Sequence, residues 1–238
     1  MPVDVLAIAA HRDDVELTCA GTLIRAADAG HRTGILDLTA GESATRGSAE
    51  LRAQEAERAA GILGVAERRN AGLPDAHLRN TDESRRVVVE QIRHFVPRVV
   101  ILPFPVGRHP DHRVTSELGR DACFLAGLAR YDAGGTPHRP FKILYALSYR
   151  EDPVKPTFVV DITPQFGRKM EAIRCYASQF DGVTTAGELF PAAQDLYGLI
   201  ETQSAHYGSL IRVRYGEPFY TEETVQVDDI AGLTVQSM

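Results

Sequence analysis

The sequence predicts an α/β protein with a Rossmann-like, three-layer fold, in which helices cover both faces of a mostly parallel sheet. Three observations support this prediction. Short aliphatic runs alternate with longer amphipathic runs over the first two thirds of the chain, as expected for βαβ units. The runs at 3–9, 34–39 and 98–102 have the length and aliphatic content of buried strands. The 238 residues, 44% of them hydrophobic, suit one sizeable domain.

The signals at the ends of the helices define the elements of this first part. Serine or threonine favours a helix start, acidic residues favour the first turn, and glycine favours the position just past the end. The expected elements are a strand at 3–9, a helix at 16–29 closed by Gly30, a strand at 34–39, a helix at 48–63 between Ser48 and Gly64, a loop holding Gly72, Pro74 and Asp75, a helix capped by Thr81, a strand at 98–102 and a helix at 111–131.

The last third has a different pattern and is expected to complete the sheet and add helices over the site. No linker or repeat interrupts the chain, so we predict a single domain over 1–238, with a Rossmann-like core at 1–130 and a C-terminal completion at 131–238. The expected elements there are strands at 141–149 and 158–162, a helix from Thr163-Pro164 to about Phe180, a loop at 181–187 and a helix from about Ala192.

Composition and charge exclude several classes of function. The net charge of -6 and the pI of about 5.8 give no electrostatic reason to bind nucleic acid or an anionic membrane. No apolar run is long enough to span a membrane, and no signal peptide is recognised, so we expect a cytoplasmic protein. Three widely spaced cysteines predict neither a disulfide framework nor a thiolate metal site. The Arg68-Arg69 pair is interpreted as a solvated face.

A first cluster of chemically active side chains follows the first strand. His11, Asp13 and Asp14 lie in AHRDDVE, between that strand and the first helix. Ligands bind at the carboxyl ends of strands in open α/β sheets. Imidazole and carboxylate are zinc ligands, and neighbouring aspartates point different ways, so one can bind metal while the other acts on a water. An aspartate that merely caps the helix is the alternative interpretation.

A second cluster, RHPDH, follows the strand at 98–102. His109 and His112 are three residues apart and lie on one side of a starting helical turn, and Asp111 can orient an imidazole. A solvated helix start is again the alternative. In the common doubly wound order, the first and fourth strands are neighbours at the switch point. That order would bring the two clusters together as a hydrolytic metal site.

These segments resemble the signatures of the LmbE-like (PIG-L) superfamily of zinc deacetylases, A-H-P-D-D-x-E near the N-terminus and H-P-D-H about a hundred residues later. Further segments resemble the branch that deacetylates N-acetylglucosaminyl-malate in bacillithiol synthesis. They are DLTAGE at 37–42, the Arg52/Glu55 pair, GLPD at 72–75, PHR at 137–139 and YASQF at 176–180. The resemblance becomes loose after Phe180.

The resemblance implies roles for nine side chains and an amino-sugar substrate. Zn²⁺, with Fe²⁺ as the alternative, would be bound by His11, Asp14 and His112. Asp13 would be the general base, and His109 would stabilise the oxyanion or act as general acid, tuned by Asp111 and Arg139. Arg52 would contact the sugar or its substituent, Arg139 would also bind the substrate, and Glu42 would contact the substrate or support a helix or loop. Relatives of this kind often form hexamers, so the resemblance also implies a homo-oligomer.

Two departures from the family pattern leave further interpretations open. Arg12 replaces the family proline, which would stiffen the ligand loop, so the chain could be a degenerate, non-catalytic relative. The segment 181–197 matches poorly, and Tyr197 is considered as the counterpart of a family tyrosine that assists the transition state. A chitooligosaccharide deacetylase, an amidase of thiol conjugates and a nucleotide-binding module are also considered. The nucleotide-binding module is disfavoured because no GxGxxG follows the first strand.

Overall fold

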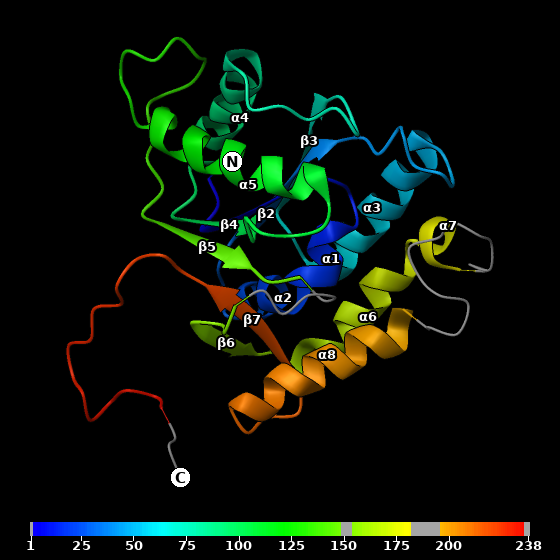
Figure 1. Ribbon diagram of the computed structural model, residues 1–238, viewed down its shortest axis with the longest axis vertical. Helices are drawn as coiled ribbons and strands as arrows, with labels where there is room; N and C mark the ends of the chain where they lie inside the picture. The colour runs from blue at the N-terminus through cyan, green and yellow to red at the C-terminus, as the bar shows by residue number, and fades with distance from the viewer. Residues whose placement is uncertain (1, 149–153, 182–195, 236–238) are drawn as a thin grey trace.

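A seven-stranded sheet forms the centre of the computed structural model, which describes residues 2–148, 154–181 and 196–235 (Figure 1). The strand order is β3-β2-β1-β4-β5-β7-β6, and only β7 runs antiparallel to its two neighbours, β5 and β6. The mostly parallel α/β fold is therefore confirmed. The strands are β1 Val5–Ala9, β2 Thr33–Thr39, β3 Glu67–Leu73, β4 Val99–Pro103, β5 Lys142–Ala146, β6 Phe158–Asp161 and β7 Gly216–Tyr220.

Helices cover both faces of the sheet, because side chains alternate along each buried strand. Leu6 and Ile8 of β1 pack with residues of α4 and α5, whereas Ala7 and Ala9 pack with residues of α2, α3 and α6. The helices are α1 Asp14–Thr18, α2 Ala20–Asp28, α3 Ala49–Leu63, α4 Asp82–Phe95, α5 Pro110–Ala126, α6 Phe166–Arg174 after a 3₁₀ turn at Thr163–Gln165, α7 Ala177–Phe180 and α8 Leu196–Leu210.

The predicted helix ends are confirmed where a capping group was recognised. The Ser48 side chain accepts a hydrogen bond from the amide of Leu51, and Gly64 ends α3 at a φ of 71°. Thr81 and Ser84 form a reciprocal capping box at the start of α4. These local hydrogen bonds explain why the boundaries of α3 and α4 follow from the sequence.

The helix predicted at 16–29 is wrong as a single element, since the chain breaks at Cys19 into α1 and α2. A buried ion pair of 2.8 Å, between Lys169 of α6 and Glu217 of β7, fills the break. Lys169 donates to the carbonyl of Leu17, and Glu217 accepts from the amides of Gly21 and Thr22. Distant groups therefore satisfy the helix ends that the break exposes.

Three further predictions need correction. The predicted loop containing Gly72 is partly the edge strand β3, whose sequence ERRNAGL lacks an aliphatic run. Strand β7, with the sequence GEPFY, was not predicted either. Helix α5 ends at Ala126 instead of continuing to 131, because the chain turns at Gly127. The loop at 181–187 and the start of the last helix fall largely outside the described residues.

The topology positions the candidate site at the carboxyl ends of two adjacent strands. β1 pairs with β4 in parallel, so the segment after Ala9 and the segment after Pro103 leave the same edge of the sheet. The first leads to α1 and the second to α5. None of the helices in the described ranges combines the length and apolar character needed to cross a membrane. The division at residue 130 stays a prediction.

Candidate metal and catalytic site

Three side chains from the two predicted clusters meet at this edge of the sheet. His11 follows β1, Asp14 begins α1, and His112 lies in the first turn of α5. The Nδ1 atom of His11 is 3.2 Å from one carboxylate oxygen of Asp14, and Nε2 of His112 is 3.1 Å from the other. One ligand atom from each residue lies within 4.8 Å of the other two. Two imidazoles and a carboxylate suit a catalytic divalent metal with an open position.

The electrostatics of the cluster also fit a cation. His11 is buried, which disfavours its charged form, but Asp14, Asp111 and Asp75 outweigh this effect and raise the pKa of His11 to about 12. Burial of Asp14 favours its neutral form, yet His112 and His11 hold the pKa of this carboxyl well below its usual range. The cluster therefore stabilises positive charge, and a divalent metal would satisfy the same carboxylates.

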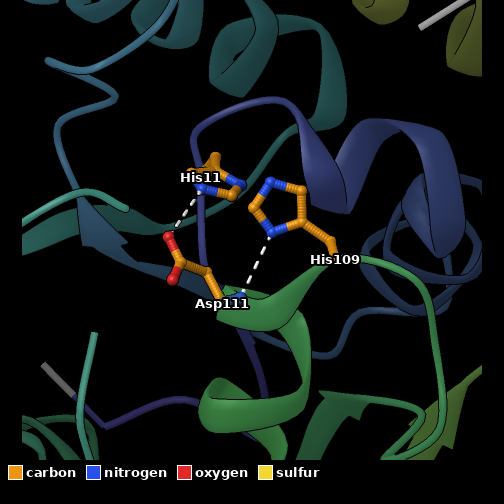
Figure 2. A group of neighbouring side chains, drawn as sticks. All are labelled: His11, His109 and Asp111. Atoms are coloured by element: carbon orange, nitrogen blue, oxygen red, sulfur yellow. Dashed lines mark hydrogen bonds and ion pairs between the residues drawn. The ribbon is translucent and has the colours of Figure 1, made fainter. Parts of the chain in front are cut away.

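Two carboxylates face the second ring nitrogen of His11. Its Nε2 atom lies 3.1 Å from Oδ1 of Asp75 and 3.5 Å from Oδ2 of Asp111. Figure 2 shows the contact with Asp111. The amide of Ala76 donates to Asp111, and the amide of Ser43 donates to Asp75, so both carboxylates are held in place. A proton on Nε2 leaves Nδ1 of His11 to face Asp14 as a potential metal ligand.

His109 lies against both histidines of the cluster. Its ring stacks on His112 at a centroid distance of 4.6 Å and meets His11 edge-on at 4.9 Å. Nδ1 of His109 accepts a hydrogen bond of 3.2 Å from the backbone amide of Asp111 (Figure 2). Burial, together with His112 and His11, lowers the pKa of His109. With Nδ1 occupied as an acceptor, neutral His109 carries its proton on Nε2 and can donate there.

Asp13 turns away from Asp14 toward α3. One of its carboxylate oxygens lies 2.8 Å from a guanidinium nitrogen of Arg52, and both side chains are buried. Gly41 makes room for this pair, since a Cβ atom there would lie 2.3 Å from Arg52, and its φ of +75° also favours glycine. Arg52 therefore holds the orientation of Asp13 beside the metal-ligand cluster.

Known proteins are similar to this chain in sequence and in structure. The sequence profile of the GlcNAc-PI de-N-acetylase (PIG-L) family matches residues 6–123, which include both clusters. A diacetylchitobiose deacetylase of Thermococcus kodakarensis is 31% identical over 232 residues, covering 90% of this chain and 80% of that protein. The chain belongs to the GlcNAc-PI de-N-acetylase (PIG-L) family. The resemblance inferred from the two motifs is thus confirmed.

Two more relatives extend the similarity of this PIG-L protein over nearly its whole length. A probable N-acetyl-α-D-glucosaminyl L-malate deacetylase 2 of Bacillus anthracis is 30% identical over 215 residues, which cover 83% of this chain and 89% of that one. The crystal structure of the conserved protein TT1542 from Thermus thermophilus superposes with a TM-score of 0.85 at 34% identity, covering 95% of this chain and 98% of that one.

Arg12, where this PIG-L chain departs from the family proline, points away from the metal-ligand cluster. Its guanidinium donates a 2.6 Å hydrogen bond to the carbonyl of Ala49, at the start of α3. The Arg12 carbonyl accepts hydrogen bonds from Arg68 and from the Tyr176 hydroxyl. The side chain therefore adds no charge at the cluster, and the backbone of the ligand loop is fixed by other residues.

Arg68 is the centre of a buried network behind the ligand loop, so its interpretation as part of a solvated face is wrong. It bonds both carboxylate oxygens of Asp37, at 2.8 and 2.9 Å, and lies 2.6 Å from Glu16. Tyr176 donates to the same Glu16 oxygen at 3.0 Å. No feature of the sequence indicated that Arg68 is buried, because residues 67–73 were not recognised as a strand.

The remaining predicted side chains of the PIG-L site lie in different places. Glu42 accepts from the amide of Asp75 at 2.8 Å and so forms part of the site wall. Arg139 packs on Phe124 near the far end of α5, about 20 Å from the site at 1.5 Å per helical residue. Within this chain, Arg139 is not brought to the cluster. The Tyr197 hydroxyl donates to Asp181.

Asp111 and Asp75 both contact His11; the sequence predicted that Asp111 orients an imidazole without saying which one, and it did not predict the contact of Asp75. Asp111 was also expected to tune His109; its carboxylate faces His11 and its backbone amide donates to His109, while its charge opposes the lowering of the His109 pKa by burial, His112 and His11. Asp75 was noted within GLPD without a role. Its approach to His11 depends on the loop after β3, and no spacing pattern predicts that contact. The GLPD match was the only signal that could have identified it.

Proposed function

We propose that this protein is a metal-dependent hydrolase that removes the acetyl group from an N-acetylglucosamine unit of a small molecule. The observation that carries the proposal is the arrangement of His11, Asp14 and His112 with Asp13 on one side and His109 on the other. Membership of the PIG-L family supports the reaction class, and the two curated relatives act on N-acetylglucosamine derivatives according to their names.

The three proposed metal ligands have the chemistry that zinc requires. A divalent metal bound there would supply Lewis acidity toward the acetyl carbonyl and lower the pKa of a bound water. We propose Zn²⁺, because two imidazole nitrogens and one carboxylate oxygen match its ligand preference, with Fe²⁺ as the alternative. Metal analysis of the protein purified with and without air distinguishes the two metals.

The proton transfers are assigned to Asp13 and His109. Arg52 contacts one carboxylate oxygen of Asp13, so the other oxygen accepts the proton of the attacking water. His109 donates from Nε2 to the oxyanion that develops on the acetyl group, because its Nδ1 is already an acceptor. Asp13 then returns its proton to the leaving amine, and acetate departs. Glu42 and Arg52 stay proposals as substrate contacts.

The proposed substrate is N-acetylglucosaminyl-L-malate, which the motif similarity to the bacillithiol branch favours. Diacetylchitobiose is the second candidate, because the relative named for it covers 90% of this chain at 31% identity. Acetate release from N-acetylglucosaminyl-malate, diacetylchitobiose and N-acetylglucosamine, measured side by side, tests the proposal. A protein that holds stoichiometric metal yet releases acetate from none of the three would contradict it.

The location and the assembly of the protein are also proposed. A cytoplasmic location is supported by three free cysteines, Cys19, Cys123 and Cys175, of which the first two are buried. A homohexamer is proposed from the family resemblance, and sedimentation of the purified protein tests it.

A further inference from the structure

An exposed segment after β7 combines aliphatic side chains with acidic ones. We define the C-terminal arm as residues 221–235, which follow β7 and are exposed except for Thr221. Its aliphatic side chains are 45–86% exposed, and they are Val225, Val227, Ile230, Leu233 and Val235. Residues 221–238 contain four carboxylates and no lysine or arginine. Five exposed aliphatic side chains within residues 225–235 are typical of a segment that binds another protein surface.

Within the described residues, hydrogen bonds and ion pairs fix the arm to the body only at its beginning. The Arg120 guanidinium binds both carboxylate oxygens of Glu222, at 2.9 and 3.2 Å, and the amide of Thr221 donates to Thr157. Over the described residues 224–235, the hydrogen bonds join arm residues to one another. The arm then runs away from the body (red in Figure 1). Its aliphatic side chains therefore remain in water in a single copy of the chain.

A basic aromatic patch lies close to the point where the arm begins. Phe124 of α5 is 58% exposed, and Phe141, just before β5, is 72% exposed. Arg139 lies over the Phe124 ring at 4.5 Å, while Arg98 and Lys142 lie over the Phe141 ring at 4.7 and 5.7 Å. Only Pro140 separates Arg139 from Phe141 along the chain, so the two rings belong to one surface.

We propose that the C-terminal arm of one copy docks on the basic aromatic patch of a second copy of this chain. The acidic, aliphatic arm and the cationic, aromatic patch are complementary in charge and in apolar character. Arg120 lies one helical turn before Phe124, so each arm starts beside its own patch. Two copies that meet at this face about a two-fold axis therefore exchange arms reciprocally.

The reciprocal arrangement explains why the partner is a second copy. One arm on one patch is a small contact, and reciprocal exchange doubles the area that is buried, which favours the two-copy arrangement because specific interfaces bury roughly 1,200–2,000 Å². It also gives Arg139 a role at its observed position, on Phe124, where it cannot reach the metal cluster of its own chain. This docking does not depend on the proposed reaction, because it concerns assembly alone.

The first test measures the mass of the protein in solution. Light scattering on the full chain should give a dimer or a multiple of it. Truncation after Glu223 and the substitution Phe141→Glu should each reduce the mass at matched concentration. Leu210→Glu, at a 54% exposed aliphatic residue on α8, is the matched control and should leave the mass unchanged. An unchanged mass in both the truncated chain and Phe141→Glu would overturn the proposal.

The second test separates exchange between copies from folding back within one copy. A zero-length carbodiimide reagent links an amine to a carboxylate that contacts it. In the described ranges, the only exposed lysines are Lys142 and Lys155. In a mixture of ¹⁴N- and ¹⁵N-labelled protein, we expect mixed-isotope links between Lys142 and Asp228 or Asp229. Links confined to one isotope would mean that each arm covers its own patch, and they would overturn the proposal.

Discussion

Oδ1 of Asp75 lies 3.1 Å from Nε2 of His11, on the side of the imidazole ring opposite Asp14. This contact fixes which nitrogen of His11 is free to bind a metal. Asp75→Asn should therefore lower metal affinity by roughly 10–100-fold, the usual effect of losing a carboxylate that orients a histidine ligand. Titration of the metal-free protein with Zn²⁺ against a competing chelator measures the effect.

The control for this prediction is Asp132→Asn, because the Asp132 side chain is 94% exposed and lies far outside the cluster. It should bind zinc like the unaltered protein. If Asp75→Asn bound zinc equally well, the orienting role of Asp75 would be wrong. Circular dichroism of both variants verifies that the fold is retained.

Arg68 and its neighbour Arg69 offer a matched pair for a stability prediction. Arg68→Met leaves the buried carboxylates of Asp37 and Glu16 without their cation, which should lower the free energy of unfolding by about 3–5 kcal/mol. Arg69 contacts Glu67 at the surface, so Arg69→Met should change the free energy of unfolding by less than about 1 kcal/mol. Urea unfolding of both variants compares them, and equal losses would contradict the central position of Arg68.

The fold was predictable where local signals and burial agree. β1, β2 and β4 have continuous aliphatic runs because helices cover both of their faces. β3 escaped recognition because an edge strand tolerates the charged residues of ERRNAGL. The break at Cys19 was not predictable, since the groups that satisfy it, Lys169 and Glu217, are distant in the sequence.

In the candidate site, too, the features that follow from local sequence signals were predictable, and the contacts between distant segments were not. His11, Asp14 and His112 come together because two recognisable strands end at one edge of the sheet. Asp75 reaches this site from a loop, and loop geometry has no periodic signal. Arg139 was assigned by motif similarity alone, and the structure places it on Phe124 instead. Motif similarity therefore did not predict the contacts that Asp75 and Arg139 make.

The separation of Asp13 from the metal-ligand residues leads to a kinetic prediction. Asp13→Asn keeps the size of the side chain but removes its basicity, so kcat should fall roughly 10²–10⁴-fold, the usual range for a general base. Metal content should be retained, since Asp13 pairs with Arg52 and not with His11 or His112. His112→Ala should instead lose metal. Full activity in Asp13→Asn would remove Asp13 from the mechanism.

The position of Arg12 predicts that this departure from the family pattern does not impair the site. The Arg12 side chain bonds the carbonyl of Ala49, and only its backbone carbonyl meets Arg68 and Tyr176. Arg12→Ala should cost about 1 kcal/mol of stability for one lost hydrogen bond. Zinc affinity and kcat should stay within about twofold of the unaltered protein, because the ligand loop keeps its backbone contacts. Zinc titration and acetate release on one preparation test both, and a tenfold change in either would show that the guanidinium acts on the metal site.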